Sequence, residues 1–229
     1  MKTMKTIEQV WKMFPDTIKE NWHQHNNGKG WVYSTARVDD SAYVGSDAQV
    51  SGDAQVSGDA QVYGNARVSG DAQVYGNAWV SGSARVSGSA RVYGNAWVSG
   101  DARVSGSARV SGSVRVYDNA RVSGDARVSG SAQVYGDAQV YGNAWVSGSA
   151  RVSGDAWVLS PLYIQGSRHS LTLASFTEIA IGCHLHTISF WKDNYEKIGQ
   201  TEGYTVQQVE EYLGYILLCE QYAARYCKK

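Results

Sequence analysis

The chain has 229 residues, and its 21 lysines and arginines equal its 21 aspartates and glutamates. Only 18% of the residues are charged, so the sequence lacks the one-signed charge that general duplex-DNA binders, polybasic membrane-surface proteins and acidic DNA mimics depend on. We therefore expect no duplex DNA partner and no membrane partner, and any charge-based function must be local.

Hydropathy and cysteine usage predict a cytoplasmic protein. No apolar run approaches the roughly eighteen residues of a membrane span, and residues 1–30 alternate charged and apolar positions instead of showing a signal-peptide core. The cysteines are odd in number and widely spaced, which predicts free thiols and no disulfide framework. They are Cys183, Cys219 and Cys227.

Residues 1–30 are predicted to form a helical N-terminal cap. Four apolar residues fall at i, i+3, i+4 and i+7, which is one face of a short helix: Ile7, Val10, Trp11 and Phe14. Pro15 and Asp16 predict a break before a second turn that runs to Trp22.

The next segment, residues 31–158, is a strict repeat of six residues. A valine stands at every sixth position from Val32 to Val158, without insertion or deletion. From Ala36 to Ala156 an alanine stands two residues before each valine, except that Val114 takes the place of the alanine. From Gly52 to Gly154 a glycine stands two residues after each valine, except at Asp118. Such self-similarity is the mark of a solenoid.

The repeat unit Ala-x-Val-y predicts a short strand followed by a corner. Alternation places alanine and valine inside and the x and y side chains outside. Glycine followed by Asp, Asn or Ser then makes the turn, because glycine accepts left-handed backbone angles.

This pattern resembles the hexapeptide-repeat family, which implies a left-handed parallel β-helix with three hexapeptides per coil. Three units give about 18 residues per coil and about seven coils, and the predicted class is mainly β. The resemblance also implies a trimeric acyltransferase as one function. Acyltransferases of that family place a catalytic histidine in or beside the coils, whereas the repeat contains no histidine and no inserted loop. We therefore predict no catalytic residue and lean toward a protein that is not an enzyme.

Outward residues eighteen apart are predicted to stack into three faces. The first face carries Tyr43, Gln61, Trp79, Trp97, Arg115, Gln133 and Arg151, with Tyr63, Tyr117 and Tyr135 beside them. The second carries Gln55, Gln73, Arg91, Arg109, Arg127 and Trp145, flanked by Tyr75 and Tyr93. The third carries Arg67, Arg85, Arg103 and Arg121 beside Ser69, Ser87, Ser105 and Ser123.

Two of these faces are candidate interaction surfaces. Three interpretations of the arginine ladder on the third face stay open. It is a solvated surface whose charge is screened by corner aspartates, or it binds an anion, or it forms a subunit interface. The stacked Trp79 and Trp97 favour ligand stacking or association, because large exposed aromatic side chains mark such sites.

Residues 159–229 are predicted to form a β+α C-terminal cap domain. Residues 162–190 read as short alternating strands, with turns near Gly166 and Gly182. A helix is predicted over 191–198, and Thr205 and Gln208 form a capping box that opens a second helix. The second helix is predicted to carry one apolar face: Val206, Val209, Leu213, Ile216 and Leu217.

The C-terminal domain also holds the candidate polar site residues. His184 and His186 share one face of a strand, with His169 as a third candidate ligand, but two ligands with no carboxylate spacing do not make a metal site. A Cys183 nucleophile is a minor alternative. We predict no metal and no cofactor.

The combined repeat and tail resemble uncharacterised phage and prophage proteins. The residues that carry this resemblance are Ser160–His169, Ile181–Thr187 and Trp191. The resemblance implies the host cytoplasm as the location and offers two roles. One role is a rigid scaffold. The other is an antagonist of host defence, which sequesters a nucleotide signal or masks a host protein.

The sequence therefore predicts a binding or scaffold protein that forms a homo-oligomer, with a trimer as one candidate. A nucleotide site would use the tail, where phosphate pairs with Arg168 and a base stacks on Tyr163 or Trp157. The polar groups around it would be Gln165, His169, His184 and His186.

Overall fold

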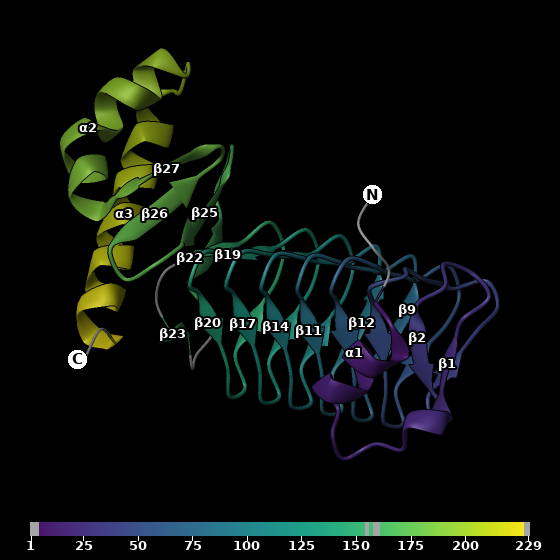
Figure 1. The fold of residues 1–229 in the computed structure, drawn as a ribbon. Helices are drawn as coiled ribbons and strands as arrows, with labels where there is room; N and C mark the ends of the chain where they lie inside the picture. Colours follow the sequence, from purple (N-terminus) through teal and green to yellow (C-terminus); the bar gives the residue numbers. More distant parts are fainter. Residues whose placement is uncertain (1–4, 154–155, 158–160, 227–229) are drawn as a thin grey trace.

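The computed structural model describes residues 5–153, 156–157 and 161–226, with only the backbone for 156 and 157. Most of the chain forms a parallel β-solenoid of about seven turns, and a small α+β domain lies at its C-terminal end (Figure 1). The predicted class, mainly β with a solenoid and a C-terminal β+α domain, is confirmed.

The solenoid has three sheets, called A, C and D here. Sheet A contains β1 (Trp22–Gln24), β2 (Trp31–Tyr33), β5 (Gln49–Val50), β8 (Arg67–Val68), β11 (Arg85–Val86), β14 (Arg103–Val104), β17 (Arg121–Val122), β20 (Gln139–Val140) and β23 (Ala156–Trp157). Sheet C contains β3 (Arg37–Val38), β6 (Gln55–Val56), β9 (Gln73–Gly76), β12 (Arg91–Gly94), β15 (Arg109–Val110), β18 (Arg127–Val128) and β21 (Trp145–Val146). Sheet D contains β4 (Tyr43–Val44), β7 (Gln61–Val62), β10 (Trp79–Val80), β13 (Trp97–Val98), β16 (Arg115–Val116), β19 (Gln133–Tyr135) and β22 (Arg151–Ser153).

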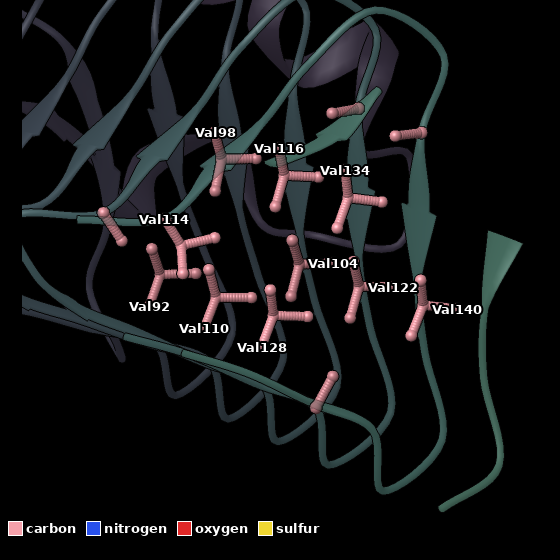
Figure 2. Packing of buried hydrophobic residues seen from close by; sticks show 14 of the residues in the cluster. Val92, Val98, Val104, Val110, Val114, Val116, Val122, Val128, Val134 and Val140 are labelled. Atoms are coloured by element: carbon pink, nitrogen blue, oxygen red, sulfur yellow. The ribbon is translucent and has the colours of Figure 1, made fainter. Parts of the chain in front are cut away.

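Neighbouring strands pair in register eighteen residues apart, as the repeat predicts. Trp79 pairs with Trp97, and Arg85 pairs with Arg103. The valines from Val44 to Val152 are fully buried, and Figure 2 shows those labelled between Val92 and Val140 stacked in the interior. Each buried valine contributes about 1.5–3 kcal/mol of gross hydrophobic stabilisation, so the column of valines is the main source of cohesion.

The backbone conformation at the corners explains why a glycine recurs in the repeat. At Gly106 the backbone has φ +66°, and a Cβ atom there would lie 2.8 Å from the backbone nitrogen of Gly124 on the next turn. A side chain is therefore excluded both by conformation and by contact. Asp118 is the exception in sequence and takes φ +58°, and its carboxylate accepts a hydrogen bond from the Gly136 N–H at 3.2 Å.

A strand closes the N-terminal end of sheet A, which the sequence analysis missed. β1 pairs antiparallel with β2. The following loop covers the edge of β4, where the N–H of Val44 donates to the carbonyl of Asn27 at 3.0 Å and its carbonyl accepts from Gly30 at 2.7 Å. Two of the three open strand edges at this end are thus paired.

The predicted N-terminal helix forms but does not cover the end of the solenoid. α1 (Ile7–Met13) starts with a capping box between Thr6 and Gln9, and a short 3-10 turn, η1 (Lys19–Asn21), precedes β1. At the C-terminal end of α1, the Met13 sulfur accepts a hydrogen bond from the Arg67 guanidinium of sheet A at 3.0 Å. The same guanidinium lies 5.6 Å from the Phe14 ring. The helix thus lies beside sheet A, with Val10 as its buried residue. Within residues 1–30, the strand edges are covered by β1 and the loop after it.

The last turn departs from the repeat. Trp157 pairs with Val140, which is one residue out of the eighteen-residue register, and Val158 lies outside the described residues. The chain then forms an antiparallel sheet of β24 (Tyr163–Gln165), β25 (Ser170–Leu173), β26 (Glu178–Ile181) and β27 (His184–Thr187). The N–H of Ser153 donates to the carbonyl of Ala174 at 2.9 Å, which joins this sheet to the end of sheet D.

Two helices complete the C-terminal domain. α2 (Ile188–Thr201) is three residues longer at each end than predicted, and its earlier start follows from Thr187, which caps its N-terminus. The predicted capping box opens α3 (Val206–Tyr226), where the Gln208 side chain accepts from the Thr205 N–H at 3.0 Å. None of the helices in the described residues combines the length and apolarity that a membrane crossing requires.

The predicted apolar face of α3 is partly wrong. Val206 and Leu217 are exposed, whereas the buried residues of the helix follow a face rotated from the predicted one. They are Tyr212, Ile216, Cys219 and Ala223. The rotation follows from Tyr212, whose hydroxyl group bonds the turn after β24 and fixes which side of the helix faces the sheet.

Candidate functional site

The arginine ladder of sheet A forms as predicted. Arg67, Arg85, Arg103 and Arg121 occupy paired positions on successive strands. Arg67 is partly covered, and burial followed by the charge of Arg85 lowers its pKa from the ordinary arginine value. None of these arginines forms an ion pair with a described residue. The corner aspartates therefore do not contact the ladder in ion pairs.

The charges of the solenoid are segregated along its axis. Residues 31–80 contain two arginines and six aspartates, whereas residues 81–153 contain eight arginines and four aspartates. The arginines of the second segment lie mainly on sheets A and C, on strands β11, β12, β14, β15, β17 and β18. The solenoid therefore has an acidic N-terminal half and a basic C-terminal half, although the whole chain is neutral.

The aromatic strip lies on sheet D. The rings of Trp79 and Trp97 are stacked with centroids 4.8 Å apart, and Tyr63 meets Trp79 edge-on at 5.9 Å. The Arg115 guanidinium lies 5.8 Å from the Trp97 ring, and 44% of Trp97 remains exposed. The rings therefore pack against each other, but they leave an apolar surface on the outside of the solenoid.

Arg168 and His169 lie in the turn between β24 and β25, and both are exposed. The Arg168 guanidinium donates to the carbonyl of Gly203 at 2.7 Å and lies 4.8 Å from the Tyr204 ring. The Tyr212 hydroxyl accepts from the N–H of His169 and donates to the carbonyl of the same residue, each at 2.6 Å. Arg168 is thus already bonded within the domain, whereas the His169 side chain faces a cavity described below.

His184 and His186 share one face of β27, as predicted. Their ring centroids lie 6.1 Å apart. His184 Nε2 lies 3.4 Å from a carboxylate oxygen of Glu202, and the His186 ring packs on Phe190 at 4.1 Å. The described residues contain no group of three or more His, Cys, Asp or Glu side chains that could hold a metal ion.

The other predicted tail residues lie apart from these histidines. The Tyr163 hydroxyl donates to the Gln165 side chain at 3.1 Å, and Tyr163 lines a groove with Trp145 at the end of sheet C. The side chain of Trp157 lies outside the described residues. The structure therefore divides the predicted tail site into two places.

A cavity of about 390 Å³ lies between the C-terminal helices, β27 and the last turn of sheet D. Four aromatic residues line it, Trp191, Tyr195, Tyr204 and Tyr212, together with His169 and His184. Burial is the main cause that raises the pKa of Tyr204 to about 12. Sequence reasoning found the two histidines but missed the aromatic lining, because no short-range spacing links α2, α3 and the sheet.

One solenoid arginine, Arg151 of β22, also lines the cavity. Cys183 and Glu202 lie at the same cavity. The second described cysteine, Cys219, is fully buried, and burial raises the pKa of its thiol to about 12, so this thiol is unreactive in the folded chain. Cys227 lies outside the described residues.

The architecture defines a parallel β-solenoid protein with an appended α+β domain. Residues 42–145, less than half of the chain, match the model of the bactofilin family, which is described as polymer-forming and cytoskeletal. Residues 138–154 match a model of the YdcK β-solenoid repeat. No match was found among curated proteins.

The chain is thus similar to a polymer-forming β-solenoid family over most of its repeat. The hexapeptide-repeat β-helix is a related kind of fold, so the resemblance predicted from sequence is confirmed at the level of a β-solenoid. The left hand of the coil stays a prediction.

Proposed function

We propose that this chain is a non-enzymatic scaffold protein that assembles with further copies of itself through the side of its solenoid. The observation that carries the proposal is the regular seven-turn solenoid, whose residues 42–145 are similar to a family described as polymer-forming. A ladder in which each turn contacts only its neighbours forms a rigid rod with long flat faces. Such a rod suits a structural role and needs no active site.

Most of the strand edges at the ends of the solenoid that the structure describes as paired belong to sheets A and D, and their pairing favours contact along the sides. At the N-terminal end, β1 and the loop before β2 pair the edges of sheets A and D. At the C-terminal end, β25 lies against β22, and the α+β domain extends beyond the last turn. Strand addition is blocked at these covered edges, which leaves the long faces of the rod and the edge of sheet C at β3 as surfaces for contact.

Charge complementarity points to an antiparallel arrangement of two rods. The acidic half of one copy then faces the basic half of the other, and the two-fold symmetry repeats the contact. A parallel arrangement in register would place like charges together and is disfavoured. The aromatic strip on sheet D remains available for a further contact between pairs, which would extend the assembly.

Charge reversal in the basic half tests this arrangement. Arg103→Glu with Arg109→Glu places two carboxylates on sheets A and C of one turn, and we expect the association constant to fall by about tenfold or more at low salt. Light scattering over a range of protein concentrations measures it. A matched control, Lys197→Glu with Arg225→Glu, makes the same net charge change on exposed helix positions and is expected to leave association unchanged.

The aromatic strip is tested in the same assay with Trp97→Gln. If Trp97→Gln loses association while the charge-reversed protein associates normally, the interface lies on sheet D. Equal loss in the control and in the charge-reversed protein would show a general effect of net charge and would contradict the antiparallel arrangement.

Four further features of the function are predicted from the sequence alone. A trimer, a cytoplasmic location and a phage origin stay predictions from the sequence. The role as a defence antagonist that sequesters a nucleotide or masks a host protein also stays a prediction, and the cavity of the C-terminal domain is the described feature that would serve ligand sequestration.

A further inference from the structure

We propose that the cavity between the C-terminal helices and the last solenoid turn binds a small aromatic molecule that carries an anionic group. The ring would lie among the aromatic side chains, and the anion would pair with Arg151. This inference does not depend on self-assembly of the solenoid, since the cavity lies within one chain.

The shape and lining of the cavity fit a ring. Its volume of about 390 Å³ falls within the range of about 300–1,000 Å³ typical of small-molecule sites. Most of its lining is apolar, and the aromatic residues come from both helices: Trp191 and Tyr195 from α2, and Tyr212 from α3, with Tyr204 between the helices. Aromatic side chains on several sides favour a flat ligand over a flexible chain.

The aromatic walls are held in place by other contacts. The Trp191 indole N–H donates to the carbonyl of Ile179 at 2.8 Å, and Tyr212 bonds the turn at His169. Tyr204 meets Tyr212 edge-on at 5.2 Å, and Arg168 covers its ring. The helices approach closely at Gly199, where a Cβ atom would lie 2.8 Å from the side chain of Val209. A ligand would therefore meet a preformed site.

The polar groups at the cavity favour an anion. Glu202 is the acidic residue of the lining, and its carboxylate faces His184 at 3.4 Å. Arg151 is half-buried and has no ion-pair partner among the described residues. A half-buried guanidinium is a strong binder of carboxylate and phosphate groups, which it can bond with two parallel N–H donors. Arg151 and Glu202 form no ion pair with each other, so the guanidinium is available to an anionic group of a ligand.

The sequence pattern places Arg151 at this site. It stands in register with Gln133 on the last strand of sheet D, and the C-terminal domain covers this end of the sheet. The other arginine of sheet D, Arg115, lies two turns earlier against Trp97. Arg115 is therefore a matched control from the same face of the solenoid.

The test uses the full chain and 1-anilinonaphthalene-8-sulfonate, a fluorescent aromatic probe with one anionic group. We expect saturable binding with one site per chain. Arg151→Gln should lower the affinity for the probe by about tenfold. Ile198→Phe, which adds bulk to the lining, should abolish probe binding. Arg115→Gln should bind as the unchanged protein does. Circular dichroism melts of each variant confirm that the domain is folded.

Two further arms define the chemistry. N-phenyl-1-naphthylamine has the same rings without the anion, and its affinity should be equal in the unchanged protein and in Arg151→Gln if Arg151 contacts only the anion. Competition by indole-3-acetate and by adenosine monophosphate then distinguishes an aromatic carboxylate from a nucleotide as the class of ligand.

The proposal is overturned if the sulfonate probe binds Arg151→Gln and Ile198→Phe as tightly as it binds the unchanged protein. It is also overturned if Arg115→Gln weakens binding as much as Arg151→Gln, because the probe would then lie on the aromatic strip of sheet D. Neither result bears on self-assembly, which is measured separately.

Discussion

At the scale of single residues, the corners of the solenoid are the most constrained positions. From Gly52 to Gly130, each repeat glycine has a positive φ, and a Cβ there would contact the backbone of the corner on the next turn. A side chain therefore meets two separate penalties, the left-handed conformation and the contact between turns. The closeness of the contact varies along the solenoid, which allows the two penalties to be separated.

Replacement of Gly106 by alanine is predicted to destabilise the solenoid more than replacement of Gly58. The φ values are +66° and +65°, but the added Cβ would lie 2.8 Å from the next backbone at Gly106 and 3.3 Å at Gly58. We expect a loss of about 1–2 kcal/mol for Gly58→Ala, which is mainly conformational, and about 2 kcal/mol more for Gly106→Ala. Urea unfolding measures the difference, and equal losses would show that the contact between turns has no effect.

Glu211 gives the C-terminal domain a dependence on pH. Hydrogen bonds from Ser167 lower the pKa of Glu211 below the ordinary glutamate value of 4.5, with a smaller contribution from Tyr215. Because the folded pKa is lowered, this contact stabilises the domain fully above the ordinary value and is lost as the pH falls through the lowered one. The carboxylate accepts the Ser167 N–H at 2.8 Å.

The change Glu211→Gln is predicted to reduce the acid sensitivity of the domain. Between about pH 5 and pH 3, the melting temperature of the unchanged domain should fall more than that of Glu211→Gln. Its neighbour Glu210 is exposed and forms no ion pair with a described residue, so Glu210→Gln is the control. Parallel pH curves for Glu211→Gln and the unchanged chain would exclude this contact as the cause.

At the scale of elements, the Tyr212 hydroxyl group makes the largest number of hydrogen bonds between α3 and the turn after β24. Tyr212 accepts the N–H groups of Arg168 and His169 at 3.2 and 2.6 Å and donates to the His169 carbonyl. No Cβ would fit at Gly166, because it would lie 2.5 Å from this hydroxyl oxygen. The turn after β24 and the buried face of α3 therefore fit each other closely.

Removal of this hydroxyl group is predicted to loosen the domain. Tyr212→Phe leaves two backbone N–H groups without their acceptor, and we expect a loss of about 1–3 kcal/mol in the free energy of unfolding of the domain. Hydrogen exchange should show faster exchange at 168 and 169. Tyr215→Phe removes a single hydrogen bond, to Glu211, and leaves no backbone N–H without its acceptor, so it should have a smaller effect. An equal effect of both variants would contradict the special role of Tyr212.

The elements also show which features the sequence could predict. The solenoid register was predictable because the period of eighteen residues fixes which side chains stack, as Trp79 and Trp97 show. The place of α1 and the buried face of α3 were not predictable, since they depend on contacts such as Met13 with Arg67 and Tyr212 with the turn at His169. The cavity joins residues from the repeat and both helices, so local patterns pointed to His169, His184 and Cys183 but not to the aromatic lining.

At the scale of the whole molecule, a neutral chain carries opposite charges on the two halves of a rigid rod. Attraction between opposite halves acts over about 8–10 Å at moderate ionic strength and weakens as salt is added. The account therefore predicts an assembly that responds to salt, although the net charge of the chain is zero.

The most direct test of the central claim is sedimentation velocity of the full chain over a range of protein and salt concentrations. The account predicts species larger than the 24.9 kDa monomer that grow with protein concentration at low salt and dissociate as salt is raised. A single 24.9 kDa species at every protein and salt concentration would contradict the proposal that this solenoid is a self-assembling scaffold.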